Sequence, residues 1–324
     1  MVEGLQGVLE AIIAFLADPR FEGISLKFFI PAEIYDRVFS GFPGKVQSRS
    51  VFLRWRSADL ISMLAKRYLR ILDRTEALSH QEAENLRSSV ERAYRSHDGR
   101  HLKHEFWYDT KFLPQRITNR RGIEEDCLAY MFRHTHMRPR DLITQMQHII
   151  DEARSRQEFP TVSSQSVIAG VHNDEGLLQI LGDSLITHEG RLSEKLVSSA
   201  RSVFFQRPRI MTTRDLRWFS QELYSLQPLA SIDPGDFLEQ LLFCGAIGRV
   251  ENEKPRKDRA ELYCKAKFEY LMQGNLPLAD RFLYCVHPVM GDVFHMSSPQ
   301  DRGVIYPMPE SEEESWFLSD AELA

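Results

Sequence analysis

The chain has 324 residues, of which 41 are lysine or arginine and 46 are aspartate or glutamate, so its formal net charge is −5. A hydrophobic fraction of 43% and a charged fraction of 27% are typical of a globular protein that can bury a core, and the length suggests about two domains. The mildly acidic balance excludes a global attraction to nucleic acid or anionic membranes, so any such contact requires a local patch.

The cysteines are few and far apart, at Cys127, Cys244, Cys264 and Cys285, and none forms a C-x-x-C pair. This pattern fits neither a structural zinc site nor a disulfide framework, and it predicts reduced thiols in a cytoplasmic protein. Glu3 and Glu10 interrupt the amphipathic segment 1–17, and no run of 18 apolar residues follows anywhere. We therefore expect neither a signal peptide nor a membrane span.

The first 58 residues alternate between helical and extended patterns. Apolar residues at helical spacing predict a helix within 1–17, and short apolar runs predict strands over 25–30 and 50–55. Pro31 is suited to open a helix over 32–39 between these strands. Because two strands are too few for a stable open sheet, residues 1–58 are expected to form the edge of a larger α/β core.

Residues 59–156 follow an almost wholly helical pattern, which predicts a helical domain. Ser57 is a plausible cap for a helix through Leu72. Further helices are expected over His80–Ser96, Ile123–Thr135 and Pro139–Arg156, and residues 157–164 have the composition of a linker.

The last third predicts helices followed by strands. Helices fit 166–184, 192–206, 213–226 and 233–246, with Thr213 and Asp233 as N-caps. A short strand over 249–251, a charged loop over 252–259 and a period-2 strand over 262–270 come next. This order predicts a winged helix-turn-helix domain over 157–296. The acidic tail 297–324 is expected to be disordered.

Known catalytic motifs do not occur. Gly44-Lys45 is the sole Gly-Lys dipeptide, but Val46 follows it and Phe39 stands where a phosphate-binding loop needs its first glycine. No strand ends in an acidic Walker B pair, and neither G-x-S-x-G nor H-E-x-x-H is present. We therefore expect no catalytic residue in this chain.

The densest charged cluster lies at the junction of two predicted helices, over residues 133–141. Arg138 and Arg140 flank Pro139, where guanidinium groups near a helix N-terminus suit phosphate recognition. A solvated basic turn neutralised by Asp141 is the alternative, and on spacing alone we prefer it. His134 and His136 do not share a helix face, so no metal pair is expected between them.

The charged loop of the predicted wing could contact nucleic acid or a partner protein through Lys254, Arg256, Lys257 and Arg259. Four acidic residues, Glu251, Glu253, Asp258 and Glu261, balance these cations. Because duplex binding normally requires a surplus of cations, this neutrality weakens the interpretation as a DNA-binding transcriptional regulator and favours a protein contact.

Three segments resemble STAND-like, AAA-related prokaryotic P-loop ATPases. The runs 26–34 and 51–60 are similar to strands that follow the Walker B strand. The segments 130–135 and 138–143 resemble the helical lid, and 243–248 with His287-Pro288 resembles the C-terminal winged helix. The resemblance implies a predominantly α chain with an α/β edge: a partial NTPase core, a helical lid and a winged helix.

The resemblance also implies functional residues and partners. Arg140 resembles a sensor arginine that faces the γ-phosphate, and His134, Arg54 and Arg138 are further nucleotide-sensing candidates. The family uses ATP and Mg²⁺, but its phosphate-binding loop and Walker B acid are absent here. The expected partner is a missing N-terminal NTPase portion or another protein, with self-assembly as an alternative. The implied function is a regulatory or defence-type nucleotide switch that does not hydrolyse ATP by itself.

Overall fold

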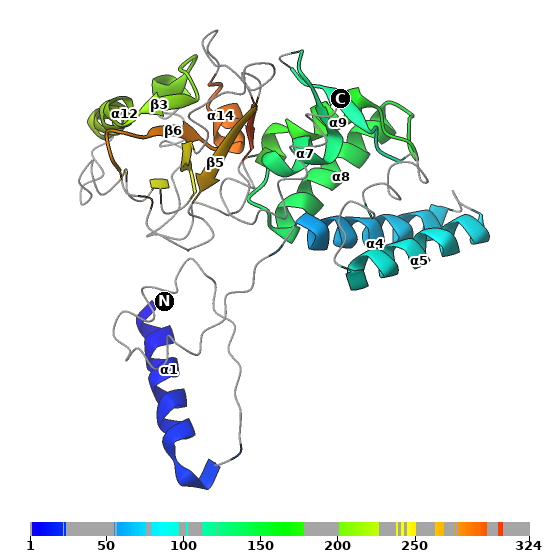
Figure 1. Ribbon diagram of the computed structural model, residues 1–324, viewed down its shortest axis with the longest axis horizontal. Coiled ribbons are helices and arrows are strands. Elements are labelled where there is room, and N and C mark those ends of the chain that lie inside the picture. Colours follow the sequence, from blue (N-terminus) through cyan, green and yellow to red (C-terminus); the bar gives the residue numbers. More distant parts are fainter. Residues whose placement is uncertain are drawn as a thin grey trace. The chain divides into compact units, whose positions relative to one another are not determined.

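The computed structural model describes residues 2–21, 23, 55, 57–75, 79–96, 102, 112–120, 122–177, 201–226, 238, 241–242, 245–250, 263–268, 276, 278–296 and 304–306. It divides into two compact units (Figure 1). The first comprises Met1–Arg54 with Tyr270–Gln273, and the second comprises Trp55–Glu269 with Gly274–Ala324. Each unit is described by itself below.

The first unit contains helix α1, Val2–Ala17, which confirms the amphipathic helix predicted there. Leu9 is buried on one face, whereas Val8 is 55% exposed. A 3₁₀ turn, η1 (Pro19–Phe21), follows, and the Phe21 ring stacks on Phe15 at 3.8 Å between centroids. The strands predicted over 25–30 and 50–55 and the helix predicted over 32–39 lie outside the described residues, apart from Trp55.

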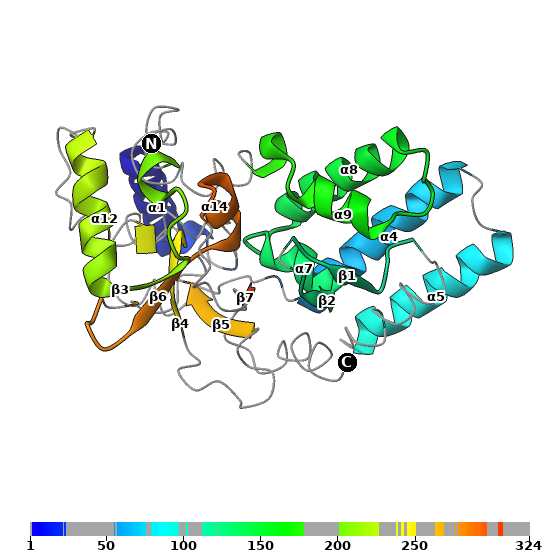
Figure 2. The ribbon, with the colours of Figure 1, turned by 90° about the horizontal axis from the view of Figure 1, so that it is seen from above.

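The second unit contains a helical domain with its own hydrophobic core. Its helices are α4 (Ser57–Thr75), α5 (His80–Ser96), α7 (Cys127–Arg133), α8 (Pro139–Ser155) and α9 (Ser164–Val171). α4 and α5 run side by side, as do α8 and α9 (Figures 1 and 2). The bounds of α5 match the prediction, and a capping box explains its start. The Ser79 amide donates to Glu82 Oε2 at 2.9 Å, and the Glu82 amide donates to Ser79 Oγ at 3.3 Å.

One predicted helix of this domain begins later than expected. The sequence predicted a helix from Ile123, but Glu124–Asp126 forms strand β2, which pairs antiparallel with β1 (Arg116–Thr118). Gly122, at φ +78°, takes the left-handed conformation that the connecting turn requires. Asp126 then caps α7 by accepting a hydrogen bond from the Ala129 amide at 3.0 Å.

The segment predicted as a linker over 157–164 packs against the helical core through Phe159 and Val162. Val162 is buried, and its amide donates to the Phe112 carbonyl oxygen at 2.9 Å. α9 then packs so closely on α8 that a Cβ built at Gly170 would stand 2.5 Å from Ile149 Cα and N. The core therefore continues to Val171, past the domain boundary that the sequence suggested at 157.

The C-terminal domain of the second unit has a five-stranded sheet in the order β3-β6-β4-β5-β7. The strands are β3 (Ile210–Thr212), β4 (Ile247–Val250), β5 (Tyr263–Phe268), β6 (Leu283–Val286) and β7 (Val304–Tyr306). β4 and β5 were predicted, whereas the pairing of β6 between β3 and β4 was not. β7 pairs parallel with β5, so the tail is ordered at 304–306, where disorder was predicted.

Two helices accompany this sheet: α12 (Thr213–Leu226) and α14 (Pro288–Val293). The bounds of α12 match the prediction, but its cap is Thr212, because the Asp215 amide donates to Thr212 Oγ1 at 3.3 Å. A second hydrophobic core lies here, with Tyr284 and Val289 completely buried. Most of the helices predicted over 192–206 and 233–246, and the whole of the charged loop 252–259, fall outside the described residues.

The described residues are thus mostly helical, with small sheets that are antiparallel except for one pair. This confirms the predominantly α class, whereas the α/β edge predicted over 1–58 falls mainly on residues that are not described. Among the helices described, none combines the length and the apolar character that crossing a membrane requires.

Candidate functional site: a buried junction of histidines and a carboxylate

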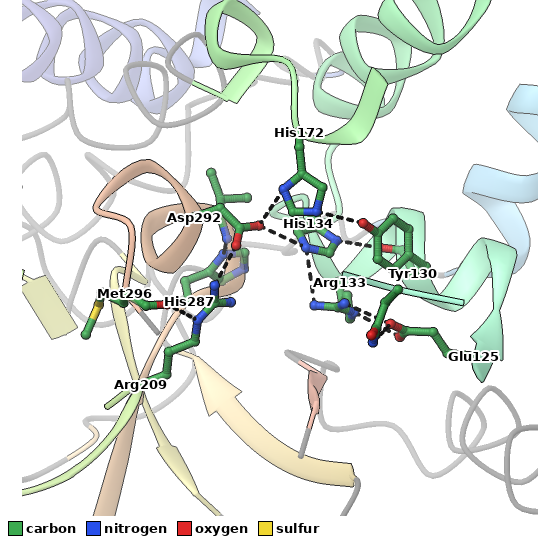
Figure 3. Close-up of polar contacts among 11 residues, drawn as sticks. Glu125, Tyr130, Arg133, His134, His172, Arg209, His287, Asp292 and Met296 are labelled. Atoms are coloured by element: carbon green, nitrogen blue, oxygen red, sulfur yellow. Dashed lines mark hydrogen bonds and ion pairs between the residues drawn. The ribbon is translucent and has the colours of Figure 1, made fainter. Parts of the chain in front are cut away.

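Three polar side chains from the ends of three different helices meet within the second unit (Figure 3). His134 is the C-cap of α7 and His172 is the C-cap of α9, both in the helical domain. Asp292 lies in α14 of the C-terminal domain. Their side chains are only 1%, 6% and 10% exposed, respectively. We call Asp292, His134, His172 and Arg209 the Asp292 junction.

Asp292 is the centre of this junction. Its Oδ1 receives Arg209 Nη2 at 2.6 Å, and Arg209 Nε donates to the Met296 carbonyl oxygen at 3.0 Å. Its Oδ2 lies 3.1 Å from His134 Nε2 and 3.2 Å from His172 Nδ1. Burial would raise the pKa of Asp292, but Arg209 and the two histidines outweigh it and hold that pKa well below its usual range. Asp292 is therefore an ionised carboxylate at neutral pH.

The histidines are oriented from behind by Tyr130. His134 Nδ1 donates to the Tyr130 carbonyl oxygen at 2.7 Å, because a carbonyl can only accept. The Tyr130 hydroxyl lies 2.7 Å from His172 Nε2. Burial, and then the charge of Arg133, lower the pKa of His134 to about 4. Neutral His134 therefore turns a lone pair on Nε2 toward Asp292.

Arg133 adds a second buried ion pair beside the junction. Its Nε and Nη2 donate to the two carboxylate oxygens of Glu125 at 3.0 and 2.9 Å, and Asn119 Nδ2 donates to Glu125 Oε1 at 2.6 Å. Arg133 Nη1 also lies 3.2 Å from His134 Nε2. This bidentate pairing neutralises the guanidinium within the helical domain and fixes its position.

A second pair of histidines lies nearby. The rings of His136 and His287 stack at 4.4 Å between centroids, and Asp141 Oδ2 accepts the His136 amide at 2.9 Å. Burial first, and then His136 and His134, hold the pKa of His287 well below its usual value, against a backbone hydrogen bond with Thr135 and the charge of Asp292. His287 is therefore neutral in the folded protein.

The structure does not bring the predicted nucleotide-sensing residues together at one site. His134 is buried and faces Asp292, Arg138 is half-buried at the N-cap of α8, and Arg140 is exposed in the first turn of that helix. Arg54 and the four wing cations, Lys254, Arg256, Lys257 and Arg259, lie outside the described residues. The cluster 133–141 is not a solvated turn, since Arg133, His134, His136 and Asp141 are all buried.

Sequence reasoning missed three members of the junction: His172, Arg209 and Asp292. They lie 38 or more residues from His134 along the chain, and no spacing links them. Asp292 lies near the end of the short helix that follows His287-Pro288. Nothing in the sequence around it indicates that its side chain is buried. A weak signal was His172 at the end of an apolar helical pattern, one turn beyond Ile168.

The junction contains the one group in the described part of the chain with the ligand types and spacing for a metal ion. The ligand atoms of His134, His172 and Asp292 all lie within 4.8 Å of one another. Two imidazole nitrogens and one carboxylate oxygen are ligands that borderline transition metals accept.

Comparison with known proteins identifies one segment. A family model described as the FunZ-associated C-terminal helical domain matches residues 84–173. The matched segment runs from α5 through α9 and includes His134 and His172, but not Arg209 or Asp292. No curated protein and no solved structure matches the chain. The helical domain is thus similar to a FunZ-associated domain, and the expected link to P-loop ATPases stays a prediction.

Proposed function

We propose that this chain is a regulatory switch in which the helical domain and the C-terminal domain communicate through the Asp292 junction. The observation that carries the proposal is the position of one carboxylate. Asp292 belongs to a helix of the second core, yet its Oδ2 lies 3.1 and 3.2 Å from two histidines that cap helices of the first core. A change on either side of this contact must therefore be felt on the other.

The energetics of buried charges support a switch rather than a permanent clamp. Bringing charged groups out of water costs several kcal/mol, which their mutual attraction roughly offsets, so the intact contact contributes little net stability. Removing one partner leaves an uncompensated charge and costs about 3–5 kcal/mol. We call the arrangement in which Asp292 contacts both histidines the closed state. The junction favours this state only slightly and responds strongly to changes around it, and a two-state switch requires both properties.

The nucleotide part of the proposal rests on the sequence resemblance. Arg138 at the N-cap of α8 and Arg140 in its first turn support it, because a helix N-terminus with arginines favours phosphate. His134 would act through the junction, since it is buried against Asp292. The phosphate-binding loop, and with it tight binding of ATP and Mg²⁺, would come from an N-terminal NTPase portion or a partner protein.

The test is hydrogen exchange in the full chain carrying Asp292→Asn. This change removes the charge and keeps the shape, so we expect amides in the last turns of α7 and α9, as well as in α14, to exchange at least about tenfold faster. Asp280→Asn is the matched control, because Asp280 is 78% exposed and pairs with Arg217 at 3.5 Å. Faster exchange confined to α14 would refute communication between the domains.

A second candidate function, duplex DNA binding by a winged helix, has one observation in its favour. The exposed face of α12 carries Arg214, Arg217 and Trp218, and the Arg207 guanidinium lies over the Trp218 ring at 5.2 Å. Exposed arginines beside an aromatic ring suit nucleic acid. Fluorescence anisotropy at about 150 mM salt tests it. Micromolar or tighter binding that Arg214→Ala and Arg217→Ala weaken, with a reduced salt slope, would establish it.

A further inference from the structure

We infer that His134, His172 and Asp292 bind a divalent transition-metal ion, and that this ion is the ligand of the proposed switch. His134 Nε2 and His172 Nδ1 both face Asp292 Oδ2 (Figure 3), and the ligand atoms of the three side chains lie within 4.8 Å of one another. Metal bonds of about 2.0–2.2 Å place neighbouring ligand atoms roughly 3 Å apart, which the contacts of 3.1 and 3.2 Å to Asp292 Oδ2 satisfy.

The orientation of both histidines suits ligation. His134 gives its Nδ1 proton to the Tyr130 carbonyl oxygen, so Nε2 presents a lone pair. The Tyr130 hydroxyl can accept the proton of His172 Nε2, which leaves a lone pair on Nδ1. Histidines that ligate metals almost always hold the second ring nitrogen in such a bond, which fixes the tautomer and the ring. Tyr130 does this for two histidines at once.

The contacts to Asp292 Oδ2 lack the geometry of hydrogen bonds. Oδ2 and His172 Nδ1 are both buried, and neither makes a hydrogen bond in the structure. In the tautomers that leave lone pairs on His134 Nε2 and His172 Nδ1, both lone pairs meet the carboxylate oxygen at 3.1–3.2 Å, and offsetting this repulsion requires a cation between them. A metal ion at their common centre would remove this repulsion and satisfy all three atoms.

The carboxylate is oriented as the histidines are. Arg209 binds Oδ1 at 2.6 Å, which turns Oδ2 toward the two imidazoles. Arg133 Nη1 at 3.2 Å from His134 Nε2 competes for the same lone pair, although its charge is already paired with Glu125. Because the pair with Glu125 holds the guanidinium in place, the ion must compete with this N–H for the Nε2 lone pair. Absence of metal binding would mean that Arg133 holds the lone pair in solution.

The ligand set narrows the class of ion. Two imidazoles and one carboxylate favour Zn²⁺, Fe²⁺, Co²⁺ or Ni²⁺ over Mg²⁺ and Ca²⁺, which prefer oxygen ligands. Two of the ligands belong to the helical domain and one belongs to the C-terminal domain. The ion would therefore hold the two domains together and stabilise the closed state in proportion to its free concentration. This consequence rests on the proposed switch, whereas binding itself does not.

The experiment uses the purified full chain after treatment with a chelator, titrated with Co²⁺ and with Zn²⁺. We expect one ion per chain, with visible Co²⁺ absorption that Zn²⁺ abolishes, and X-ray absorption of the Zn²⁺ form showing two imidazoles. His172→Ala should weaken binding at least about 100-fold. Tyr130→Phe, which keeps the ring and its packing, should weaken it about 10–100-fold. His80→Ala, at an exposed position of α5, is the control and should change nothing.

Two results would overturn the metal site. One is no stoichiometric binding at micromolar ion. The other is binding that is unchanged in both His172→Ala and Tyr130→Phe. The exchange experiment on Asp292→Asn is performed without metal, so its outcome decides the switch independently of the ion. Slower exchange in both α9 and α14 on adding Zn²⁺ to the unaltered chain would link the two proposals.

Discussion

The contact between α8 and α9 yields a sharp prediction for Gly170→Ala. In a helix this change normally stabilises by about 1 kcal/mol, because alanine has the higher helix propensity. Here the new Cβ would stand 2.5 Å from Ile149 Cα and N and 2.7 Å from its Cγ1. Carbon atoms pack best at about 3.5–4.0 Å, so α8 and α9 must separate by roughly 1 Å.

The magnitude follows from setting these effects against each other. Inserting a methyl group into a packed core costs about 1–3 kcal/mol, and the upper end applies because two of the opposing atoms are backbone atoms that cannot rotate away. Subtracting the gain in propensity leaves a net destabilisation of about 2 kcal/mol. For a helical domain of roughly 100 residues, that lowers Tm by about 8–16 °C.

Thermal unfolding followed by circular dichroism is the assay, and Gly176→Ala is the matched control. A Cβ at Gly176 would come equally near a neighbour, 2.6 Å from His148 Cδ2, but that neighbour is a side chain that can rotate. We therefore expect Gly176→Ala to change Tm by less than half as much. Equal Tm values for Gly170→Ala and the unaltered chain would show that α8 and α9 do not pack this closely, and the reasoning would fail.

Three further predictions concern charge. Glu125→Gln leaves the buried Arg133 guanidinium without its counter-ion and should lower the free energy of unfolding by about 3 kcal/mol in urea titrations; a loss below about 1 kcal/mol would contradict the pair. The unfolded chain takes up a proton on His287 below about pH 6.5, whereas the folded chain does not, so stability should fall as the pH is lowered from 6.5, and less steeply in His287→Asn; equal slopes would exclude this contribution. Calorimetry with Mg-ATP should give millimolar or weaker affinity; micromolar affinity that Arg140→Ala abolishes would reveal a complete nucleotide site.

Helices could be predicted where local signals agree with packing. Ser79 and Glu82 form a capping box in the sequence, and the helix that follows begins where they place it. The hairpin over 116–126 was missed, although Asn119 and Gly122 carry turn chemistry, because each strand has only three residues. A period of two cannot be recognised over so short a run.

The junction could not be predicted, because its members are joined by tertiary contacts alone. His134 was singled out for its neighbours in the sequence, but its contacts are set by α9 and α14, which lie far along the chain. The buried ion pair of the helical domain could not be predicted from the sequence either. Arg133 was counted in a basic cluster, whereas its partner is Glu125, eight residues earlier on a strand that had been predicted as helix.

The parallel pairing of β7 with β5 has a consequence for the solution behaviour of shortened chains. Val304–Tyr306 covers the outer side of β5, and Ile305 is buried there. A chain cut before residue 304 would leave Tyr263–Lys265 without their β7 partners along a sheet margin. Such margins recruit strands from other molecules. Shortened chains should therefore self-associate as their concentration rises. In the full chain, the segment Val304–Tyr306 of the acidic tail would protect the protein against this aggregation.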